Sequence, residues 1–231
     1  MSFRALSARH ALALGIAAAA LAACGTGSGI LGTAGSGNGA TVRFVNATAT
    51  PLDLATGGVV NAGNANIASG GGVACFTVAE PSAPGLAVRQ SGTATDLAGF
   101  TPSLSANGRY TLVAYPGTAG GIQFVSVPQA SIAVTGRSAL RVFHAAAGLG
   151  QVDVYVNAPG AGLGQPRVPG LSFGSSTGSF DVTAGATQVR LTTAGTTIVV
   201  YDAGTQSLEV EKSYTLIISS ATPAALLVPD C

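Results

Sequence analysis

From residue 40 to the end, the chain consists of short hydrophobic runs that alternate with polar residues and are separated by Gly, Pro, Asn and Asp. Alternation with a period of two places successive side chains on opposite faces of a β-strand. Val152, Val154 and Val156 therefore share one face of an expected strand, with Asp153 and Tyr155 on the other. The pattern predicts an antiparallel all-β protein. Further strands are expected at residues 139–145, 187–193, 196–202 and 213–219.

Four segments recur in the same order in the two halves of the chain. Residues 42–47 match 140–145, 72–78 resemble 177–182, 109–113 match 213–217, and a Val-Pro pair closes each half at 127–128 and 228–229. Repetition in this order indicates two structural units of one plan. We expect a first β-sandwich over 40–128, a linker over 129–138 and a second β-sandwich over 139–231.

The N-terminus resembles a bacterial lipoprotein signal. A basic start is followed by an apolar stretch over 11–23 that ends in Leu21-Ala22-Ala23-Cys24. This stretch is too short to span a bilayer, which needs about 20 residues. We expect residues 1–23 to be removed and Cys24 to be acylated; the alternative is a plain signal peptide cleaved at Ala-x-Ala. Residues 24–39 are rich in Gly and Ser, which predicts a flexible tether.

The signal also predicts a location. Gly25 follows the cysteine, and by resemblance to Gram-negative lipoprotein sorting the lack of Asp at this position favours the outer membrane. We therefore expect a lipid-anchored protein of the cell envelope, in the outer membrane of a Gram-negative bacterium. Multiple acyl chains anchor a protein stably without any spanning helix.

Charge is scarce and dispersed. Charged residues make up only 8% of the chain, and the 10 Lys and Arg occur singly. Because nucleic-acid binding needs clustered cations, we exclude nucleic acid as a partner. The 33 Gly and the many Thr, Ser and Ala predict outer faces of hydroxyl and amide groups rather than ionic ones.

Two cysteines remain if Cys24 is acylated. An oxidising compartment favours a disulfide between Cys75 and Cys231; the alternative is two separate thiols. The chain has no CxxC motif, and apart from the acylated Cys24 it has no third cysteine for a metal site; its aspartates are isolated. These features disfavour zinc, redox and calcium chemistry. We expect no metal and no cofactor.

The second half resembles a known family. Residues 140–145 (LRVFHA), 152–156 (VDVYV), 171–175 (LSFGS) and 212–215 (KSYT) are similar to the bacterial envelope family called domain of unknown function 4397. The resemblance covers about 139–219 well and 40–116 weakly, with Asn46 in place of His144. It implies sandwiches of immunoglobulin or transthyretin type, and it implies no activity.

A few residues could carry chemistry. Gly174-Ser175-Ser176-Thr177-Gly178 has the letters of a hydrolase G-x-S-x-G motif, but no helix is expected after Ser176. His144 is the one histidine outside the signal, and it precedes Ser176. Buried hydrogen bonding to the backbone or to Asp153 is its simplest role, and ligand binding or pH sensing is the alternative.

The sequence thus favours a non-enzymatic binding or structural module. Possible partners are envelope proteins or polymers, besides the membrane through the anchor. The alternatives are an envelope hydrolase that uses His144 or Ser176, or a surface-exposed adhesin. The candidate residues for a ligand or contact surface are His144, Asp153, Tyr155 and Tyr201. The two tyrosines are candidates because their strands could turn them outward.

Overall fold

The computed structural model describes residues 38–100, 103–131, 134–220 and 225–231. Within these ranges the protein is all-β, and the one helical element is a single 3₁₀ turn, η1 (Ala62–Asn64). Across the same ranges, no helix has the length and apolar character needed to cross a membrane. The all-β prediction is confirmed.

Residues 40–128 form two four-stranded sheets that pack as a β-sandwich. The inner sheet has the order β4 (Phe76–Val78), β1 (Ala40–Asn46), β7 (Arg109–Pro116), β8 (Ile122–Pro128). The outer sheet has the order β3 (Val59–Val60), β2 (Leu52–Thr56), β5 (Leu86–Gln90), β6 (Asp96–Phe100).

The second half repeats this arrangement strand for strand. Its inner sheet has the order β12 (Phe180–Val182), β9 (Ser138–Ala145), β15 (Ser213–Ser219), β16 (Ala225–Pro229). Its outer sheet has the order β11 (Val168–Leu171), β10 (Val152–Asn157), β13 (Gly185–Thr193), β14 (Val199–Leu208). Adding eight to each strand number of the first half gives the order in the second.

One strand pair in each inner sheet departs from the expected antiparallel pairing. β1 runs parallel to β7, with Val42 beside Tyr110, and β9 runs parallel to β15, with Leu140 beside Tyr214. The remaining strand pairs between named elements are antiparallel. Parallel pairing needs a long connection, which here is formed by the strands in between.

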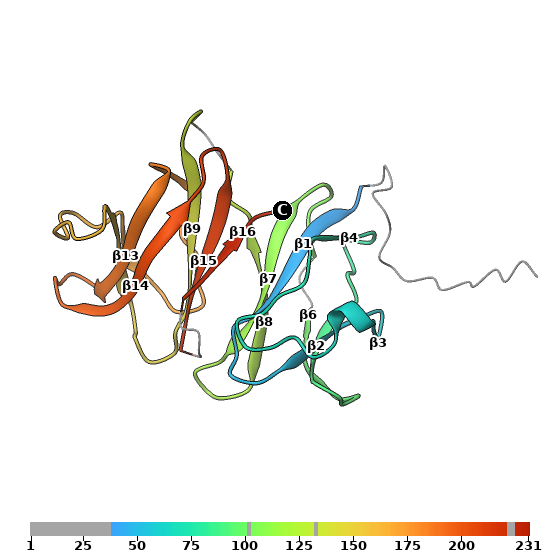
Figure 1. The fold of residues 1–231 in the computed structure, drawn as a ribbon. Coiled ribbons are helices and arrows are strands. Elements are labelled where there is room, and N and C mark those ends of the chain that lie inside the picture. The colour runs from blue at the N-terminus through green and yellow to red at the C-terminus, as the bar shows by residue number, and fades with distance from the viewer. Residues whose placement is uncertain (1–37, 101–102, 132–133, 221–224) are drawn as a thin grey trace, which may run out of the picture.

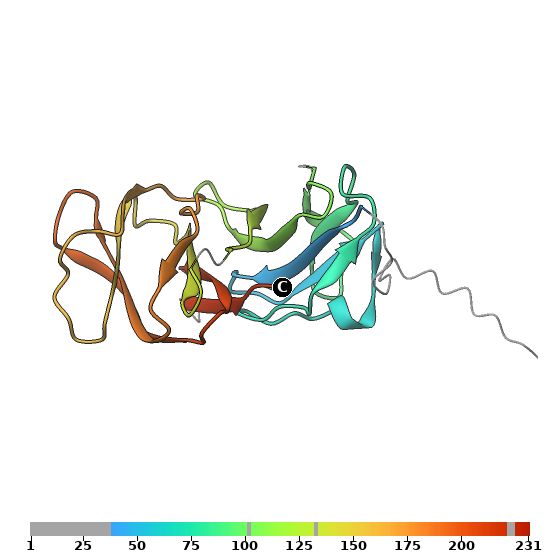
Figure 2. The ribbon, with the colours of Figure 1, turned by 90° about the horizontal axis from the view of Figure 1, so that it is seen from above.

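Three apolar clusters hold four layers together, in the order outer, inner, inner, outer (Figure 1). In β1, Val42 and Phe44 lie in the core of the first sandwich. Val45, with Ala47 just after the strand, lies in a cluster shared by the two inner sheets. Strand β9 does the same in the second half. Seen from above, the two sandwiches lie side by side along the molecule (Figure 2).

The two halves contact one another through equivalent faces. Ten of the twelve members of the shared cluster correspond in pairs under the strand equivalence, so that the same positions on both inner sheets meet; the exceptions are Tyr115 and Phe173. These pairs are Val45 and Phe143, Ala47 and Ala145, Val113 and Ile217, Val125 and Leu226, and Val127 and Val228. Such a self-complementary contact has the character of a two-fold dimer interface within one chain.

A disulfide closes one edge of this interface. Cys75, just before β4, is bonded to Cys231, just after β16, with a Cα–Cα distance of 5.8 Å. The expected disulfide is confirmed, and the alternative of two separate thiols is wrong. Because the two cysteines belong to different sandwiches, the bond joins the two halves covalently across 156 residues of sequence.

Candidate functional site

His144 lies near the end of β9 with its side chain fully buried. Its Nε2 lies 2.8 Å from the carbonyl oxygen of Gly150, and its Nδ1 accepts a hydrogen bond from the backbone N–H of Ala146 at 3.3 Å. Since Nδ1 accepts, the proton is on Nε2 and the ring is neutral. Burial lowers the pKa of the imidazole and keeps it uncharged.

Asn46 performs the same task at the equivalent position of the first half. Its Oδ1 accepts from the backbone N–H of Thr48 at 2.9 Å, two residues ahead as in the His144 pair. Its Nδ2 donates to the carbonyls of Thr50 and Ile67. Both side chains therefore brace the loop between the first two strands of their sandwich, each through carbonyl partners of its own.

Asp153 is also tied to backbone. One carboxylate oxygen accepts from the N–H of Gly170 at 2.7 Å and the other from Gly195 at 2.8 Å, so the side chain connects β10 to two loops. Asp53 in the first half accepts from Asn66 and Gly92 in the same way. Burial alone would raise the pKa of Asp53, but these N–H donors, with Ser91 and the charge of Arg89, bring it below its usual range.

Of the two tyrosines expected to face outward, Tyr155 does so and Tyr201 turns toward the core of the second sandwich. Tyr155 is nevertheless only 3% exposed, and it lines a depression together with the loop residues Pro166 and Ile198. Tyr201 is half-buried against the core of the second sandwich, and burial raises the pKa of its hydroxyl. Neither ring is an open contact surface.

Ser176 and His144 are not brought together as a nucleophile and base. Ser176 lies opposite Phe143 in an isolated bridge, so it shares the face of β9 that looks toward the first sandwich. Its Oγ lies 3.5 Å from a guanidinium nitrogen of Arg141. His144, the next residue along β9, points to the other face, where both ring nitrogens engage backbone atoms. Cys24 lies outside the described residues.

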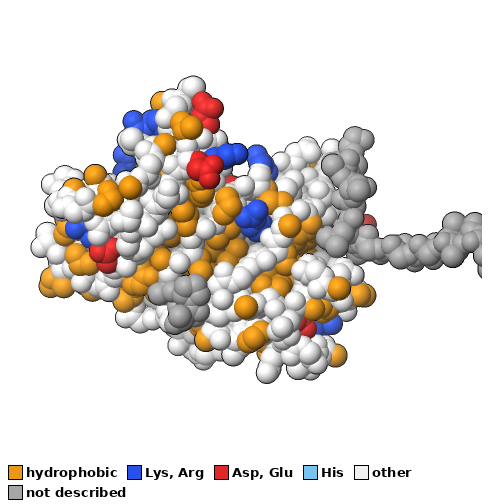
Figure 3. Space-filling model, viewed as in Figure 1, with side chains coloured by type: hydrophobic (Ala, Val, Ile, Leu, Met, Phe, Trp, Pro, Cys, Tyr) orange, Lys and Arg blue, Asp and Glu red, His pale blue; other side chains and the backbone are white. Residues whose placement is uncertain are grey.

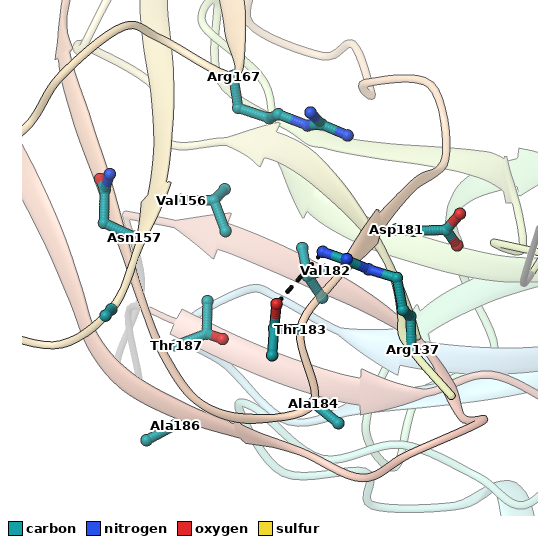
Figure 4. A pocket seen from close by; sticks show the side chains of 11 residues that line it. Arg137, Val156, Asn157, Arg167, Asp181, Val182, Thr183, Ala184, Ala186 and Thr187 are labelled. Carbon is teal, nitrogen blue, oxygen red and sulfur yellow. Dashed lines mark hydrogen bonds between the residues drawn. The ribbon is translucent and has the colours of Figure 1, made fainter. Parts of the chain in front are cut away.

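A cavity that sequence reasoning missed opens at one end of the second sandwich (Figure 4). It has a volume of about 390 Å³ and lies between the start of β9, the end of β10 and the segment from β12 to β13. Its lining residues are Arg137, Val156, Asn157, Ala158, Arg167, Asp181, Val182, Thr183, Ala184, Ala186 and Thr187. Arg137 and Arg167 are 30 positions apart in sequence, and only the folded sheets bring them to one cavity.

The surface around these sites is sparsely charged. Figure 3 shows wide areas of uncharged and apolar side chains, with most of the Lys, Arg, Asp and Glu groups of this face in its upper part. Arg89 and Asp96 form an ion pair at 2.6 Å on the outer sheet of the first sandwich. Among the described residues, no three His, Cys, Asp or Glu side chains gather in a way that could hold a metal ion.

Comparison with known families identifies the second half. Residues 138–230 match the family described as Domain of unknown function (DUF4397). This confirms the resemblance in the half where it is clearest, and the matched segment begins with β9 and takes in β16. None of the curated proteins matches the sequence.

Proposed function

We propose that the protein is a lipid-anchored, non-enzymatic module of the cell envelope that holds a two-sandwich body on a flexible tether and binds an envelope component. The observation that carries this proposal is the joining of the two sandwiches by a shared apolar cluster and the Cys75–Cys231 disulfide. A stable disulfide suits an oxidising compartment outside the cytosol. The Leu21-Ala22-Ala23-Cys24 motif supplies the anchor.

The polar groups that could have served catalysis support a binding role instead. The side chains of His144 and Asp153 form their hydrogen bonds with backbone atoms of loops. Ser176 lies on the opposite face of β9 from His144. A serine nucleophile needs a base within hydrogen-bond reach. We therefore favour the binding module over the hydrolase that would use His144 or Ser176.

We further propose that residues 40–128 are a divergent copy of the domain matched at 138–230. The support is the identical strand order of the two halves. Tyr110 and Tyr214 add to it, because each accepts a hydrogen bond from the backbone N–H five residues before it, that of Ser105 or Glu209. In each half, the side chain of Asn46 or His144 is hydrogen-bonded to the loop that follows the first strand. The carboxylate of Asp53 or Asp153 is hydrogen-bonded to two further loops.

The experiment that tests the function is in-cell crosslinking followed by affinity capture of the tagged full-length protein. The matched control is Cys24→Ala, which removes the acylation site and leaves the folded residues intact. We expect a reproducible set of envelope components with the acylated protein and its loss with the control. An empty capture, or an identical capture from both proteins, would contradict an anchored binding module. Protease treatment of intact cells separates a periplasmic module from a surface adhesin.

A further inference from the structure

We propose that the cavity at the end of the second sandwich binds the free carboxyl terminus of a peptide with small apolar side chains. The inference deepens the binding role proposed above and rests on it. Two arginines face the cavity, apolar residues line the space below them, and the lining carries a net positive charge.

The two guanidinium groups are positioned by contacts that leave donors open. Arg137 donates to the hydroxyl of Thr183 at 3.2 Å, and Arg167 lies over the ring of Phe180 with its central carbon 5.1 Å from the ring centroid. A guanidinium has five N–H donors in a planar fork that matches a carboxylate. Both groups can therefore pair with a ligand anion.

The charge of the lining favours a carboxylate over a dianion. Arg137 and Arg167 contribute two positive charges, and Asp181 at the side of the cavity contributes one negative charge (Figure 4). The net charge of one positive unit balances a single carboxylate. A phosphate group at neutral pH carries about −1.5 to −2, which exceeds what this lining neutralises.

The remaining lining favours a small aliphatic ligand. Val156, Val182, Ala184 and Ala186 supply short apolar side chains. The amide of Asn157 is already bonded to the carbonyl of Leu163 and to Arg190. No aromatic ring lines the cavity among the described residues, whereas stacking on rings is a common way to hold sugars or bases. Alanine-sized side chains fit the space of about 390 Å³.

The first sandwich lacks the same features and so provides an internal contrast. By strand register, Gly39 occupies the place of Arg137 and Thr77 that of Asp181. A Cβ on Gly39 would lie 2.6 Å from Cγ2 of Thr77, so a side chain does not fit there without rearrangement. The arginine pair is a property of the second sandwich and is not required by the fold.

The test is a binding titration of the full mature, acylated protein in detergent with N-terminally labelled tri-alanine, followed by fluorescence anisotropy. The matched ligand control is the same peptide with a C-terminal amide. We expect the free acid to bind at least tenfold more tightly than the amide. Arg137→Gln and Arg167→Gln should each weaken binding of the acid at least tenfold. Arg89→Gln, on the other sandwich, should leave it unchanged.

Several outcomes would overturn the proposal. Equal affinity for acid and amide would exclude carboxylate recognition, and full affinity in both arginine variants would place binding elsewhere. Saturation by acetate as effectively as by tri-alanine would show that the peptide is not recognised. Absence of binding at millimolar peptide would also contradict it. Arg137→Gln leaves the contact between Arg167 and Phe180 intact, so its melting temperature should match the wild type even if Arg167→Gln destabilises the fold.

This test fails independently of the proposed function. If the cavity binds no carboxylate but cells still yield an anchor-dependent set of partners, the binding module stands and uses another surface. If Arg137→Gln abolishes both peptide binding and capture, the cavity is the site through which the module acts.

Discussion

Gln129 and Asp230 make reciprocal hydrogen bonds across the interface between the two sandwiches. The side-chain oxygen of Gln129 accepts from the backbone N–H of Cys231 at 2.8 Å, and a carboxylate oxygen of Asp230 accepts from the backbone N–H of Ala130 at 2.8 Å. Each residue follows the last strand of its own half, β8 or β16. This pair of hydrogen bonds has the same two-fold relation as the contacts of the apolar cluster. The first residues of the expected linker, 129–131, are therefore bonded to the second sandwich as well as to the first.

The disulfide should contribute a large part of the stability of the joined body. Replacing both Cys75 and Cys231 by Ser releases a constraint across 156 residues, which the chain-entropy model values at about 5 kcal/mol. We expect the free energy of unfolding in urea to fall by up to that amount. Wild-type protein treated with reductant should match the variant. An unchanged midpoint in both would show that the bond does not constrain the unfolded chain.

The shared cluster should make the two sandwiches unfold together. Phe143 is buried there, with its ring 5.2 Å from that of Tyr115. Phe143→Ala removes a buried ring at a cost of about 3–5 kcal/mol, and the loss should separate one calorimetric transition into two. Phe44→Ala is the matched control, because Phe44 lies in the core of the first sandwich and not in the shared cluster. It should lower the free energy of unfolding by a similar amount, but by weakening the core of the first sandwich. A single transition in both variants would argue that the cluster does not couple the halves.

The sequence was sufficient for the fold class because period-two alternation survives in the outer sheets. Val152 and Val154 point into the core of the second sandwich, as their spacing predicts. The cysteine count and compartment predicted the disulfide, and the residues around His144 carried the family resemblance.

The interface between the halves was missed although the sequence contains a signal for it. In β7 and β15 the apolar residues are nearly continuous, and strands buried on both faces have this composition. Val113 and Ile217 fill the second face of those strands. The arginine cavity had no comparable signal, because Arg137 and Arg167 belong to loops whose meeting depends on the whole sandwich.

The buried His144 should make stability depend on pH. Its pKa is lowered in the folded protein from an ordinary value of 6.5, so the unfolded chain takes up a proton first as the pH falls. Stability is therefore complete above that value and is lost as the pH falls toward the folded pKa. His144→Asn, which copies Asn46, should cost about 1–3 kcal/mol at pH 8 by leaving the Gly150 carbonyl unpaired, and it should abolish this part of the pH dependence.

The pH dependence due to His144 is the difference in the free energy of unfolding between the wild type and His144→Asn. Burial raises the pKa of Asp230, against the hydrogen bonds from Thr215 and Ala130, so that group favours the folded state as the pH falls. Because both proteins contain Asp230, its contribution cancels in the difference. Urea unfolding of both proteins from pH 8 to pH 5 measures this difference. If the free energies of unfolding of the two proteins changed in parallel with pH, a neutral buried His144 would be contradicted.

The tyrosine hydroxyls of the two halves should have equal effects on stability. Ser105 N–H donates to Tyr110 at 3.0 Å and Glu209 N–H donates to Tyr214 at 3.1 Å. Tyr110→Phe and Tyr214→Phe should each lower the free energy of unfolding by about 1 kcal/mol. Tyr155→Phe is the control, because its hydroxyl makes no hydrogen bond to another described residue, and it should change stability less. Unequal losses for Tyr110 and Tyr214 would show that the repeated contact is not energetically equivalent.

The two-fold character of the interface predicts where a second disulfide can form. Under the strand equivalence Cys75 corresponds to Ser179 and Cys231 to Ala130. The Ser179 hydroxyl already lies 3.2 Å from both the backbone nitrogen and the carbonyl oxygen of Ser131, the residue after Ala130. The double variant Ala130→Cys with Ser179→Cys should therefore oxidise in the folded protein, and non-reducing peptide mapping should recover both disulfides.

This second bond should stabilise the fold by about 4 kcal/mol at most, since it closes a loop of about 50 residues in the chain-entropy model. The single variant Ala130→Cys controls for exchange with the native pair. If the new thiols stayed reduced while the Cys75–Cys231 bond remained intact, the two edges of the interface would differ in geometry, and the equivalence of the two faces would be limited to the apolar cluster and the Gln129–Asp230 exchange.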